Sequence, residues 1–412
     1  MTRFIRNHVD DTPIVDNVFA VVDLAKKAKA QLGEAAVVDA TIGALYDESG
    51  QLVAFRSVYR PYNEIESKIK ANYAESFSGN PDFRKQVYNW VVQQADMRLA
   101  HSTIATPGGS GAVSTTINNI LDQGETLIIP DIAWGSYRLM ATMNNMDVET
   151  YNLFEGDHFN IASFKEVCKS VMDKQKKVLV IINDPCHNPT GYSLSQEEWE
   201  EVVMFLNEIG EQGPVVMLND IAYIDYSYDF KNSRNYLETF NAISDNVAIV
   251  VAFSSSKTLT AYGLRCGAAV IMAQSDESVR QIEIVMEKSA RAIWSNIPNA
   301  AMENLVYVTT EGLNDYLEEK DYFVSLLEER SKIFLKEAKE VGLKHYPYKE
   351  GFFVTLKIED KDLCTKLHEA CMKEHIYTVQ VNKGIRIALC SLSIEKTKGL
   401  AKRIKEIFDT LS

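Results

Sequence analysis

The sequence predicts an α/β fold: a mostly parallel central sheet with helices on both faces, followed by a smaller α+β domain. Short runs of almost continuous apolar residues recur through the middle of the chain, as is typical of parallel strands buried on both faces. Amphipathic helical patterns separate these runs, which indicates the repeating βαβ order of α/β domains. From about residue 313 a long charged stretch and then alternating segments replace this pattern, which favours a second, smaller unit.

Five apolar runs have the length of buried strands, and each is too short to cross a membrane, which takes about 18 apolar residues. They are residues 127–129, 178–182, 215–218, 247–253 and 268–272. Their composition fits a parallel sheet that is covered on both faces. In the smaller domain, strand-like alternation appears around residues 351–358 and 385–389.

Helices are predicted between and after these strands. Ser195 and Glu198 have the spacing of a capping box, so a helix is expected over residues 195–206. A glycine-rich turn at residues 107–112 opens a helical run at residues 113–121. The stretch 313–341 is predicted as one long helix with a solvated, charged face.

The charge and the cysteine content narrow the function. Across 412 residues, 43 Lys and Arg stand against 57 Asp and Glu, so the net charge is −14. Nucleic acids and anionic membranes bind clustered cations, so the sequence predicts no partner of either kind. Residues 1–11 have no apolar core, so no signal peptide is predicted. The six cysteines include no C-x-x-C pair, which argues against a metal site and favours reduced thiols in the cytoplasm.

Polar segments follow several of the predicted strands, at the sheet edge where α/β proteins bind ligands. They are residues 183–191, residues 219–223, and residues 254–257 with Arg265. Together with the glycine-rich turn they bring a lysine, an aspartate, a tyrosine, an asparagine and an arginine to one edge. Pyridoxal phosphate chemistry needs this set: a lysine for the Schiff base, a carboxylate for the pyridine nitrogen, and helix N–H groups with an arginine for the phosphate. The sequence therefore predicts pyridoxal 5′-phosphate as the cofactor.

These motifs resemble those of the aspartate and aromatic amino acid aminotransferases, which are pyridoxal phosphate enzymes of fold type I. The resemblance runs from about residue 38 to residue 392. It rests on the segments 187–191 (His-Asn-Pro-Thr-Gly), 220–223 (Asp-x-Ala-Tyr), 254–257 (Ser-x-Ser-Lys) with Arg265, and 42–44 (Ile-Gly-Ala). It implies a large cofactor-binding domain at residues 48–315 and a discontinuous small domain made of residues 1–47 and 316–412.

The resemblance also implies which residues surround the cofactor. Lys257 matches the Schiff-base lysine, which moves the substrate proton, and Asp220 matches the partner of the pyridine nitrogen. Tyr223 and Asn188 match the two groups on the phenolic oxygen, and Trp134 matches the ring that stacks on the pyridine. The phosphate contacts are matched by Gly109, Ser110, Ser254 and Arg265, and by Tyr73, which is similar to a tyrosine that reaches the neighbouring subunit's phosphate.

Three more residues are expected to bind the substrate, together with Trp134 and Asn188. Arg386 matches the arginine that holds the α-carboxylate of the amino acid. Arg291 looks like the arginine that crosses a dimer interface to pair with a distal carboxylate, a task that suits a planar guanidinium. Gly43 looks like the glycine whose backbone lines the substrate site.

The chain departs from the family pattern at three positions. Gly108 stands where many aspartate aminotransferases have a phosphate-binding serine. Tyr137 and Asn183 stand where histidines support the cofactor's aspartate, so Asp220 is expected to lack its usual supports. His187 is expected to be structural.

Together these matches predict a homodimeric aminotransferase with active sites at the subunit interface. It would move an amino group between an L-amino acid, with aspartate or an aromatic amino acid favoured, and 2-oxoglutarate, by ping-pong kinetics. The cofactor residues leave open another enzyme with the same phosphate site, such as an amino-acid β-decarboxylase or a β-lyase. A pyridoxal phosphate sensor of a transcription regulator would need a basic DNA-binding domain in addition, and the predicted enzyme already fills the 412 residues, so this alternative is disfavoured. A silent scaffold would not need Lys257, Asp220 and Arg386.

Overall fold

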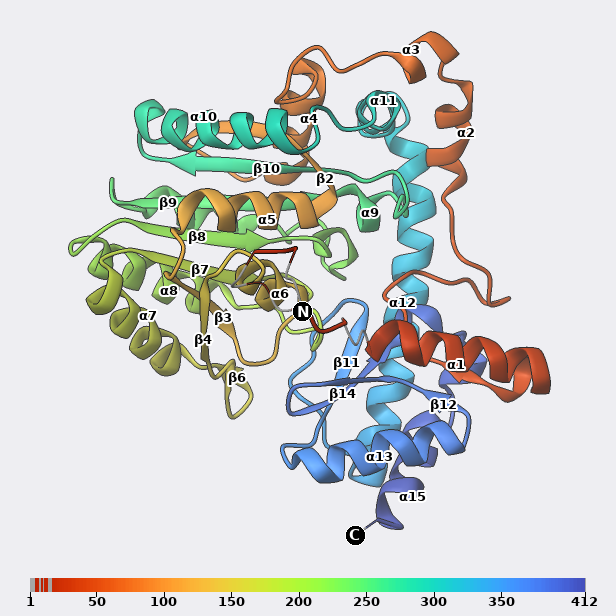
Figure 1. Ribbon diagram of the computed structural model, residues 1–412. Coiled ribbons are helices and arrows are strands. Elements are labelled where there is room, and N and C mark those ends of the chain that lie inside the picture. The colour runs from red at the N-terminus through yellow and green to blue at the C-terminus, as the bar shows by residue number, and fades with distance from the viewer. Residues whose placement is uncertain (1–3, 7–8, 10, 14–16, 412) are drawn as a thin grey trace.

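The computed structural model describes residues 4–6, 9, 11–13 and 17–411, and it confirms the predicted α/β class (Figure 1). A seven-stranded sheet lies at the centre, in the order β2-β10-β9-β8-β7-β3-β4. Neighbouring strands run parallel except at β10, which is antiparallel to both β9 and β2. The strands are β2 (Ala100–Pro107), β3 (Thr126–Pro130), β4 (Asp147–Tyr151), β7 (Val178–Asn183), β8 (Val215–Asp220), β9 (Val247–Ser254) and β10 (Cys266–Ala273).

All five predicted central strands are present, but the parallel direction predicted for residues 268–272 is wrong. Residues 255–265 alone join β9 to β10, and they include the one-turn helix α9 (Ser255–Thr258). A parallel return needs a crossover of about a dozen residues or more, so the chain turns back antiparallel. The apolar pattern does not predict β2, because the first half of that strand is polar and partly exposed.

Helices cover both faces of the sheet, as predicted, and two cores result. Side chains alternate along each strand, so Leu179 and Ile181 join one core while Val180 and Ile182 join the other. The first core includes residues of α5 (Gly108–Ile120), α6 (Ser136–Thr142) and α10 (Asp276–Ile293). The second includes residues of α4 (Pro81–Val92), α7 (Ile161–Gln175) and α8 (Gln196–Gly210).

The predicted capping box begins α8. Ser195 Oγ accepts a hydrogen bond from the Glu198 amide at 3.2 Å, and the Glu198 carboxylate accepts one from the Ser195 amide at 2.7 Å. The two bonds satisfy N–H groups that have no partner within the helix. The local sequence therefore sets the start of α8 one residue after the predicted position.

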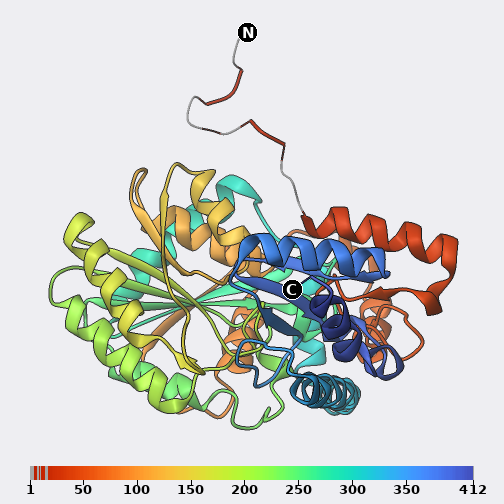
Figure 2. The same ribbon diagram turned by 90° about the horizontal axis from the view of Figure 1, so that it is seen from below.

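A smaller α+β lobe, the small lobe, contains α1 and the C-terminal elements of the chain; the central sheet and its helices form the large lobe. The helix α12 (Leu313–Val341) has the bounds predicted for it and leads from one lobe to the other. Figure 2 shows α1, near the start of the chain, beside the C-terminal elements. The lobe holds the antiparallel strands β11 (Phe353–Lys357), β14 (Gly384–Ala388) and β13 (Val379–Val381), the parallel pair β1 (Val38–Asp39) and β12 (Ile376–Tyr377), and the helices α1 (Asn17–Leu32), α13 (Lys361–Lys373), α14 (Ile394–Thr397) and α15 (Leu400–Asp409).

The boundaries proposed for the two domains, 47/48 and 315/316, stay predictions. The helix α12 continues unbroken through residue 315. Residues 1–3, 7–8, 10, 14–16 and 412 of the predicted small domain lie outside the described residues.

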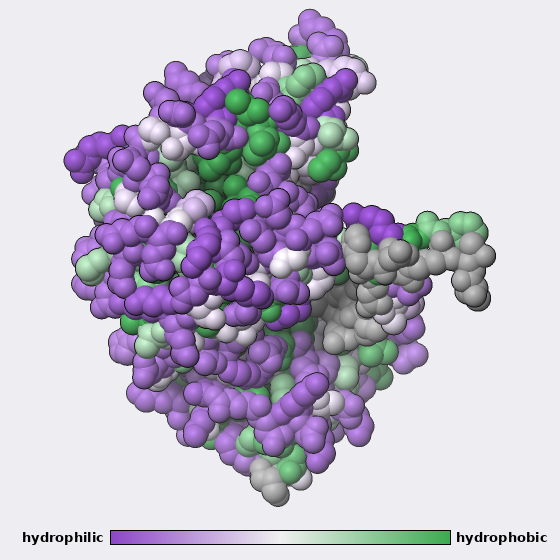
Figure 3. Space-filling view, turned by 60° about the vertical axis from the view of Figure 1, so that its left-hand side comes forward, coloured by the Kyte–Doolittle hydropathy of each residue, from purple (hydrophilic) through white to green (hydrophobic). Residues whose placement is uncertain are grey.

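Within the described residues, no helix is long and apolar enough to span a membrane. Most of the face in Figure 3 is hydrophilic, and apolar residues gather in its upper part.

The remaining elements flank the two lobes. They are α2 (Arg56–Glu64), α3 (Ser67–Ala71), α11 (Asn299–Val308), the two-stranded ribbon β5 (Phe154–Glu155) with β6 (His158–Phe159), and the short 3₁₀ helices η1 (Glu34–Ala36), η2 (Ile224–Tyr226), η3 (Asn235–Ala242) and η4 (Leu389–Ser391).

Candidate active site

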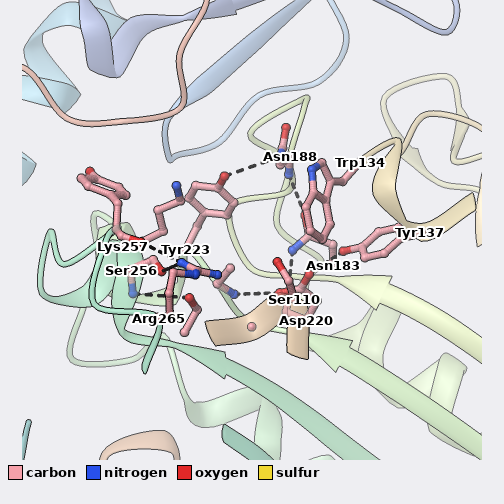
Figure 4. Close-up of a pocket in the computed structure, with 14 residues that line it drawn as sticks. Ser110, Trp134, Tyr137, Asn183, Asn188, Asp220, Tyr223, Ser256, Lys257 and Arg265 are labelled. Carbon is pink, nitrogen blue, oxygen red and sulfur yellow. Dashed lines mark hydrogen bonds between the residues drawn. The ribbon is translucent and has the colours of Figure 1, made fainter. Parts of the chain in front are cut away.

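A cavity of about 200 Å³ lies where β7, β8 and β9 end (Figure 4). Its wall brings together most of the site residues predicted from the sequence, although these come from segments far apart in the chain. The lining residues are Gly109, Ser110, Trp134, Tyr137, Asn183, Asn188, Asp220, Ala222, Tyr223, Ser254, Ser256, Lys257, Tyr262 and Arg265.

Lys257 lies on α9, directly after β9, and its amine points into the cavity. The side chain of Ser254 begins α9 by accepting a hydrogen bond from the Ser256 amide at 3.3 Å. Lys257 Nζ donates to the carbonyl of Gly43 at 2.8 Å. Burial, together with the nearby guanidinium groups of Arg386 and Arg265, lowers the pKa of the amine to about 8. A neutral amine, able to act as a base, is therefore accessible close to pH 7.

Asp220 is the last residue of β8; the usual histidines are absent, as expected, but two other donors reach its carboxylate. Tyr137 donates a 2.6 Å hydrogen bond to Asp220 Oδ2, and the amide of Ala222 donates to Oδ1 at 3.1 Å. Burial raises the pKa of the Asp220 carboxyl, and the bond from Tyr137 acts against that rise. Tyr137 thus supplies the hydrogen bond to Asp220 that the family resemblance assigns to a histidine.

Asn183 links the two ends of the cavity. Its amide nitrogen donates to the main-chain carbonyl of Asp220 at 2.7 Å, and its oxygen accepts from the Asn188 amide at 2.8 Å. The side-chain nitrogen of Asn188 then lies 3.5 Å from the Tyr223 hydroxyl, to which it donates. Figure 4 shows Asn183 near Asp220, and the bond from Asn188 to Tyr223, which lies beside Lys257. Asn183, which stands in place of the second histidine, therefore holds the main chain of both Asp220 and Asn188.

Arg386 lies on β14 and reaches Asn188 from the small lobe. Its Nη1 donates to Asn188 Oδ1 at 3.3 Å, and its Nη2 donates to the Thr41 carbonyl at 2.7 Å. The side chain is buried, yet Nε has no hydrogen-bond partner among the described residues. A buried unpaired donor is costly, which indicates that a ligand oxygen belongs beside this guanidinium.

Arg386 borders a second, wider cleft of about 660 Å³ between the lobes. Trp134 and Asn188 line both this cleft and the cavity that holds Lys257. A molecule could therefore contact Arg386 and the lysine at the same time. Trp134 is also steadied by an edge-to-face contact with Tyr137, with ring centres 5.3 Å apart.

The amino terminus of α5 forms one end of the cavity. The helix begins at Gly108, not at the predicted residue 113, and its first N–H groups are free to bind a phosphate. Arg265 lies beside it, donating to Ser256 Oγ at 3.1 Å and to the Tyr262 carbonyl at 2.7 Å. Gly108 has φ +72°, and a Cβ there would lie 2.5 Å from Arg265 Nη2. The serine of many relatives would therefore displace the arginine in this chain.

Among the described residues, three predicted site residues line neither the cavity nor the cleft. Gly43 contacts the site through its carbonyl, and a Cβ there would lie 2.6 Å from Phe353 Cζ. Tyr73 is 83% exposed. Arg291 is exposed at the end of α10, where its guanidinium covers the Phe77 ring at 4.8 Å. Any role of Tyr73 or Arg291 at a partner's site stays a prediction.

Two residues that line the cavity beside Lys257, Ser256 and Tyr262, are not among the predicted site residues. Ser256 lies within the quoted Ser-x-Ser-Lys motif, so its position between Ser254 and the lysine was a usable signal. Tyr262 accepts a hydrogen bond from the Leu45 amide at 2.9 Å, and the Lys257 amine lies 4.6 Å from the centre of its ring. Nothing local in the sequence marks that tyrosine. His187 is buried, with its Nδ1 2.8 Å from Thr190 Oγ1, which fits the structural role predicted for it.

The residues present fit pyridoxal phosphate. A helix terminus with an arginine suits the phosphate, a carboxylate suits the pyridine nitrogen, and a buried lysine suits the aldehyde carbon. Fold and site together define a pyridoxal phosphate enzyme of fold type I. The chain belongs to the family of class I and class II aminotransferases, whose family model matches residues 36–404.

Comparison with individual proteins agrees with this membership. A crystal structure of an aminotransferase from Anaerococcus prevotii is 33% identical, with a TM-score of 0.95, and the match covers 98% of this chain and 99% of that one. The aromatic-amino-acid aminotransferase of Burkholderia pseudomallei, covalently bound to pyridoxal phosphate, shares the fold at 20% identity and a TM-score of 0.80, over 99% of this chain and 100% of that one.

Curated relatives are more distant in sequence. The aspartate aminotransferase of Escherichia coli is 24% identical over 263 residues, which is 62% of this chain and 64% of that protein. The match thus spans less than two thirds of the length of that relative.

Proposed function

We propose that this protein is an aminotransferase that moves an amino group between an L-amino acid and 2-oxoglutarate, with ping-pong kinetics. One observation carries the proposal: the buried amine of Lys257 and the buried, unpaired Nε of Arg386 border two cavities that share Asn188 and Trp134. The first group suits a base at Cα, and the second suits the α-carboxylate of the same amino acid. Bound pyridoxal phosphate supplies an electron sink that stabilises the carbanion at Cα.

Lys257 is proposed to remove the proton from Cα of the bound amino acid. Its Nζ must be neutral for this step, and its pKa of about 8 keeps a fraction of the amine neutral at pH 7. The carbonyl of Gly43, 2.8 Å from Nζ, fixes the direction of the amine. The carbonyl of Lys257 itself accepts a hydrogen bond from Tyr226 at 3.1 Å, so the backbone below the amine is also held.

Asp220, Tyr223 and Asn188 are proposed to orient the cofactor and tune its charge. Asp220 would pair with the pyridine nitrogen, and the bond from Tyr137 favours its ionised form. Asn188 and Tyr223 place two donors at the opposite side of the cavity, where a phenolic oxygen would accept them.

The preferred donors are proposed to be aspartate or an aromatic amino acid. Arg386 would bind the α-carboxylate in a bidentate manner. Arg291 would pair with a distal carboxylate across the interface of a homodimer, because it is exposed and does not border the cavity of its own chain. Location in the cytoplasm is part of the same proposal.

The test is a screen of the 20 common amino acids with 2-oxoglutarate and the cofactor-loaded protein, with glutamate measured as the product. Formation of glutamate from at least one donor, absent in Lys257→Ala, is expected. If no donor yields glutamate while Lys257 still binds the cofactor, the proposal is wrong. With aspartate as donor, oxaloacetate indicates transfer, whereas alanine with CO₂ indicates a β-decarboxylase.

Arg291 is tested through specificity. Arg291→Leu should lower kcat/KM for aspartate and leave that for phenylalanine within about twofold, because only the first substrate has a distal carboxylate. An unchanged ratio of the two values would remove Arg291 from the substrate site.

A further inference from the structure

The turn between β13 and β14 joins the small lobe to the large lobe at the edge of the wide cleft. Lys383 Nζ lies 2.5 Å from Asp131 Oδ2 and 3.1 Å from Asn152 Oδ1. The neighbouring Asn382 donates to the Asp131 carbonyl at 2.8 Å. Asp131, Asn382 and Lys383 also line the cleft that Arg386 borders. An ion pair and two hydrogen bonds therefore cross from one lobe to the other beside the proposed substrate site.

The acidic partner is held rigidly on the large lobe. Asp131 follows the last residue of β3 and is three residues before Trp134. Its Oδ1 accepts hydrogen bonds from the amides of Ile132 and Leu153, both at 2.9 Å, so only Oδ2 is directed at the lysine. The side chain of Asp131 is 9% exposed, which limits screening of its charge by water.

The basic partner is held equally well on the small lobe. Lys383 has φ +61°, a conformation that costs a non-glycine residue energy and persists only where its surroundings impose it. Its carbonyl accepts hydrogen bonds from the Ile358 amide at 3.0 Å and from the Tyr346 hydroxyl at 3.1 Å. Arg386 stands three residues further along, on β14, whose pairing with β11 and β13 fixes its distance from the turn. The position of Lys383 therefore sets the position of Arg386.

The direct contact of Arg386 with the large lobe is weaker than the contact of Lys383. Arg386 Nη1 and Asn188 Oδ1 are 3.3 Å apart, near the limit of a hydrogen bond. The shorter bond of Arg386 goes to the carbonyl of Thr41, which follows β1 of the small lobe and so does not hold the arginine to the large lobe. Arg386 therefore depends on other contacts for its placement opposite Asn188 and Trp134.

We propose that Asp131 and Lys383 are positioning residues that hold Arg386 in place to receive the substrate's α-carboxylate. This inference rests on the proposed function. The ion pair acts by keeping the β13–β14 turn against the segment that carries Trp134. Loss of the pair therefore weakens the binding of every carboxylate substrate, amino acid and oxo acid alike, and leaves the proton-transfer step at Lys257 unchanged.

The test compares Lys383→Met, Asp131→Asn and the double variant with the cofactor-loaded wild-type protein. Asparagine keeps Oδ1 as an acceptor for the two amides, so it removes the charge without freeing the loop. Lys169→Met is the matched control, because Lys169 forms an ion pair with Glu208 at 2.9 Å on exposed parts of α7 and α8. Lys383→Arg is the conservative variant that should restore binding.

Kinetics give kcat and the KM values for 2-oxoglutarate and for the amino donor found in the screen, and calorimetry gives the dissociation constant of succinate. Succinate has carboxylates but no amino group to react, so its binding reports on the site without turnover. Each single variant should weaken succinate binding and raise both KM values about fivefold, on the scale of an ion pair with one exposed partner, with kcat within about twofold. The double variant should be no worse than either single variant, because both remove one contact.

Unchanged succinate binding in both single variants would overturn the inference, as would a fall in kcat at constant KM or fully additive effects. The control should match the wild type in both measurements; an equal loss in Lys169→Met would overturn the inference too. A wild-type protein that binds succinate but transfers no amino group refutes the proposed function instead, and the calorimetry then still decides whether Asp131 and Lys383 position Arg386.

Discussion

Removal of the Tyr137 hydroxyl probes how this chain replaces the missing histidine behind Asp220. Tyr137→Phe deletes a 2.6 Å hydrogen bond to Oδ2 and keeps the ring, so the edge contact with Trp134 remains. Asp220 then retains the Ala222 amide as its side-chain donor among the described residues. The ionised carboxylate loses stabilisation, whereas the protonated form loses little.

The expected size follows from the strength of such bonds. A hydrogen bond to a charged group contributes about 1.5–3 kcal/mol, and about 1.4 kcal/mol corresponds to one pKa unit. The pKa of Asp220, which burial already raises, should therefore rise by about 1–2 units more in the variant. Only ionised Asp220 pairs with a protonated pyridine nitrogen, so cofactor affinity falls as pH drops through that pKa.

The assay is the dissociation constant of pyridoxal phosphate measured from pH 5 to 9 on cofactor-free protein. In Tyr137→Phe the loss of affinity on acidification should begin about 1–2 pH units higher than in the wild type. Tyr192→Phe is the control, because Tyr192 donates a 2.7 Å bond to the Glu198 carboxylate away from the cavity. Coincident profiles of Tyr137→Phe and wild type would refute the reasoning.

Three further predictions concern the same cavity. Lys257→Ala should abolish turnover and the visible absorbance of lysine-bound cofactor. The Tm should stay within a few degrees, because burial of that amine is unfavourable. Retained turnover would rule out the lysine as the base. Acylation of Lys257 in the cofactor-free protein should rise with pH around a midpoint near 8, where exposed lysines react with a midpoint near pH 10.4, and equal midpoints would contradict the effect of burial. Gly108→Ser should weaken cofactor binding at least about tenfold, because the side chain meets Arg265 and φ is positive. Gly124→Ser is the control for the last, since Gly124 also has positive φ but no neighbour within 4 Å, and equal affinities of the two variants would argue against the collision.

The sequence predicts those parts of the fold that depend on local pattern. Continuous apolar runs mark β7, β8 and β9, and a capping box marks α8, because burial and hydrogen bonding there are decided within a few residues. The direction of β10 depends instead on the length of its connection. The start of α5 is hidden because glycines are poor helix formers in isolation. Here Gly109 and Gly111 lie in the helix, where a Cβ would come within 3.0 Å of Ser254 and 2.5 Å of Pro107.

The candidate site divides in the same way. Lys257, Asp220 and Asn188 are identified by motif, and the structure brings them to one cavity. The support of Asp220 by Tyr137 joins residues 83 positions apart, and the bond from Leu45 to Tyr262 joins residues 217 apart. Such contacts depend on how helices and lobes pack, so a motif cannot reveal them.

The pairing of β1 with β12 also constrains how the protein is made. Val38 pairs with Ile376, and the amide of Ala388 donates to the carbonyl of Ala40, so the start of the small lobe finds its partners only near the end of the chain. At about 5–20 residues per second, a ribosome needs on the order of 20–70 s to travel from the first of these segments to the second. During that interval the apolar Val37 and Val38, both buried in the finished protein, have no partner strand, and a nascent chain released early would lack Arg386 as well. A truncated product would therefore keep Lys257 and the residues that line its cavity, but it would lack the arginine proposed to bind the substrate's α-carboxylate.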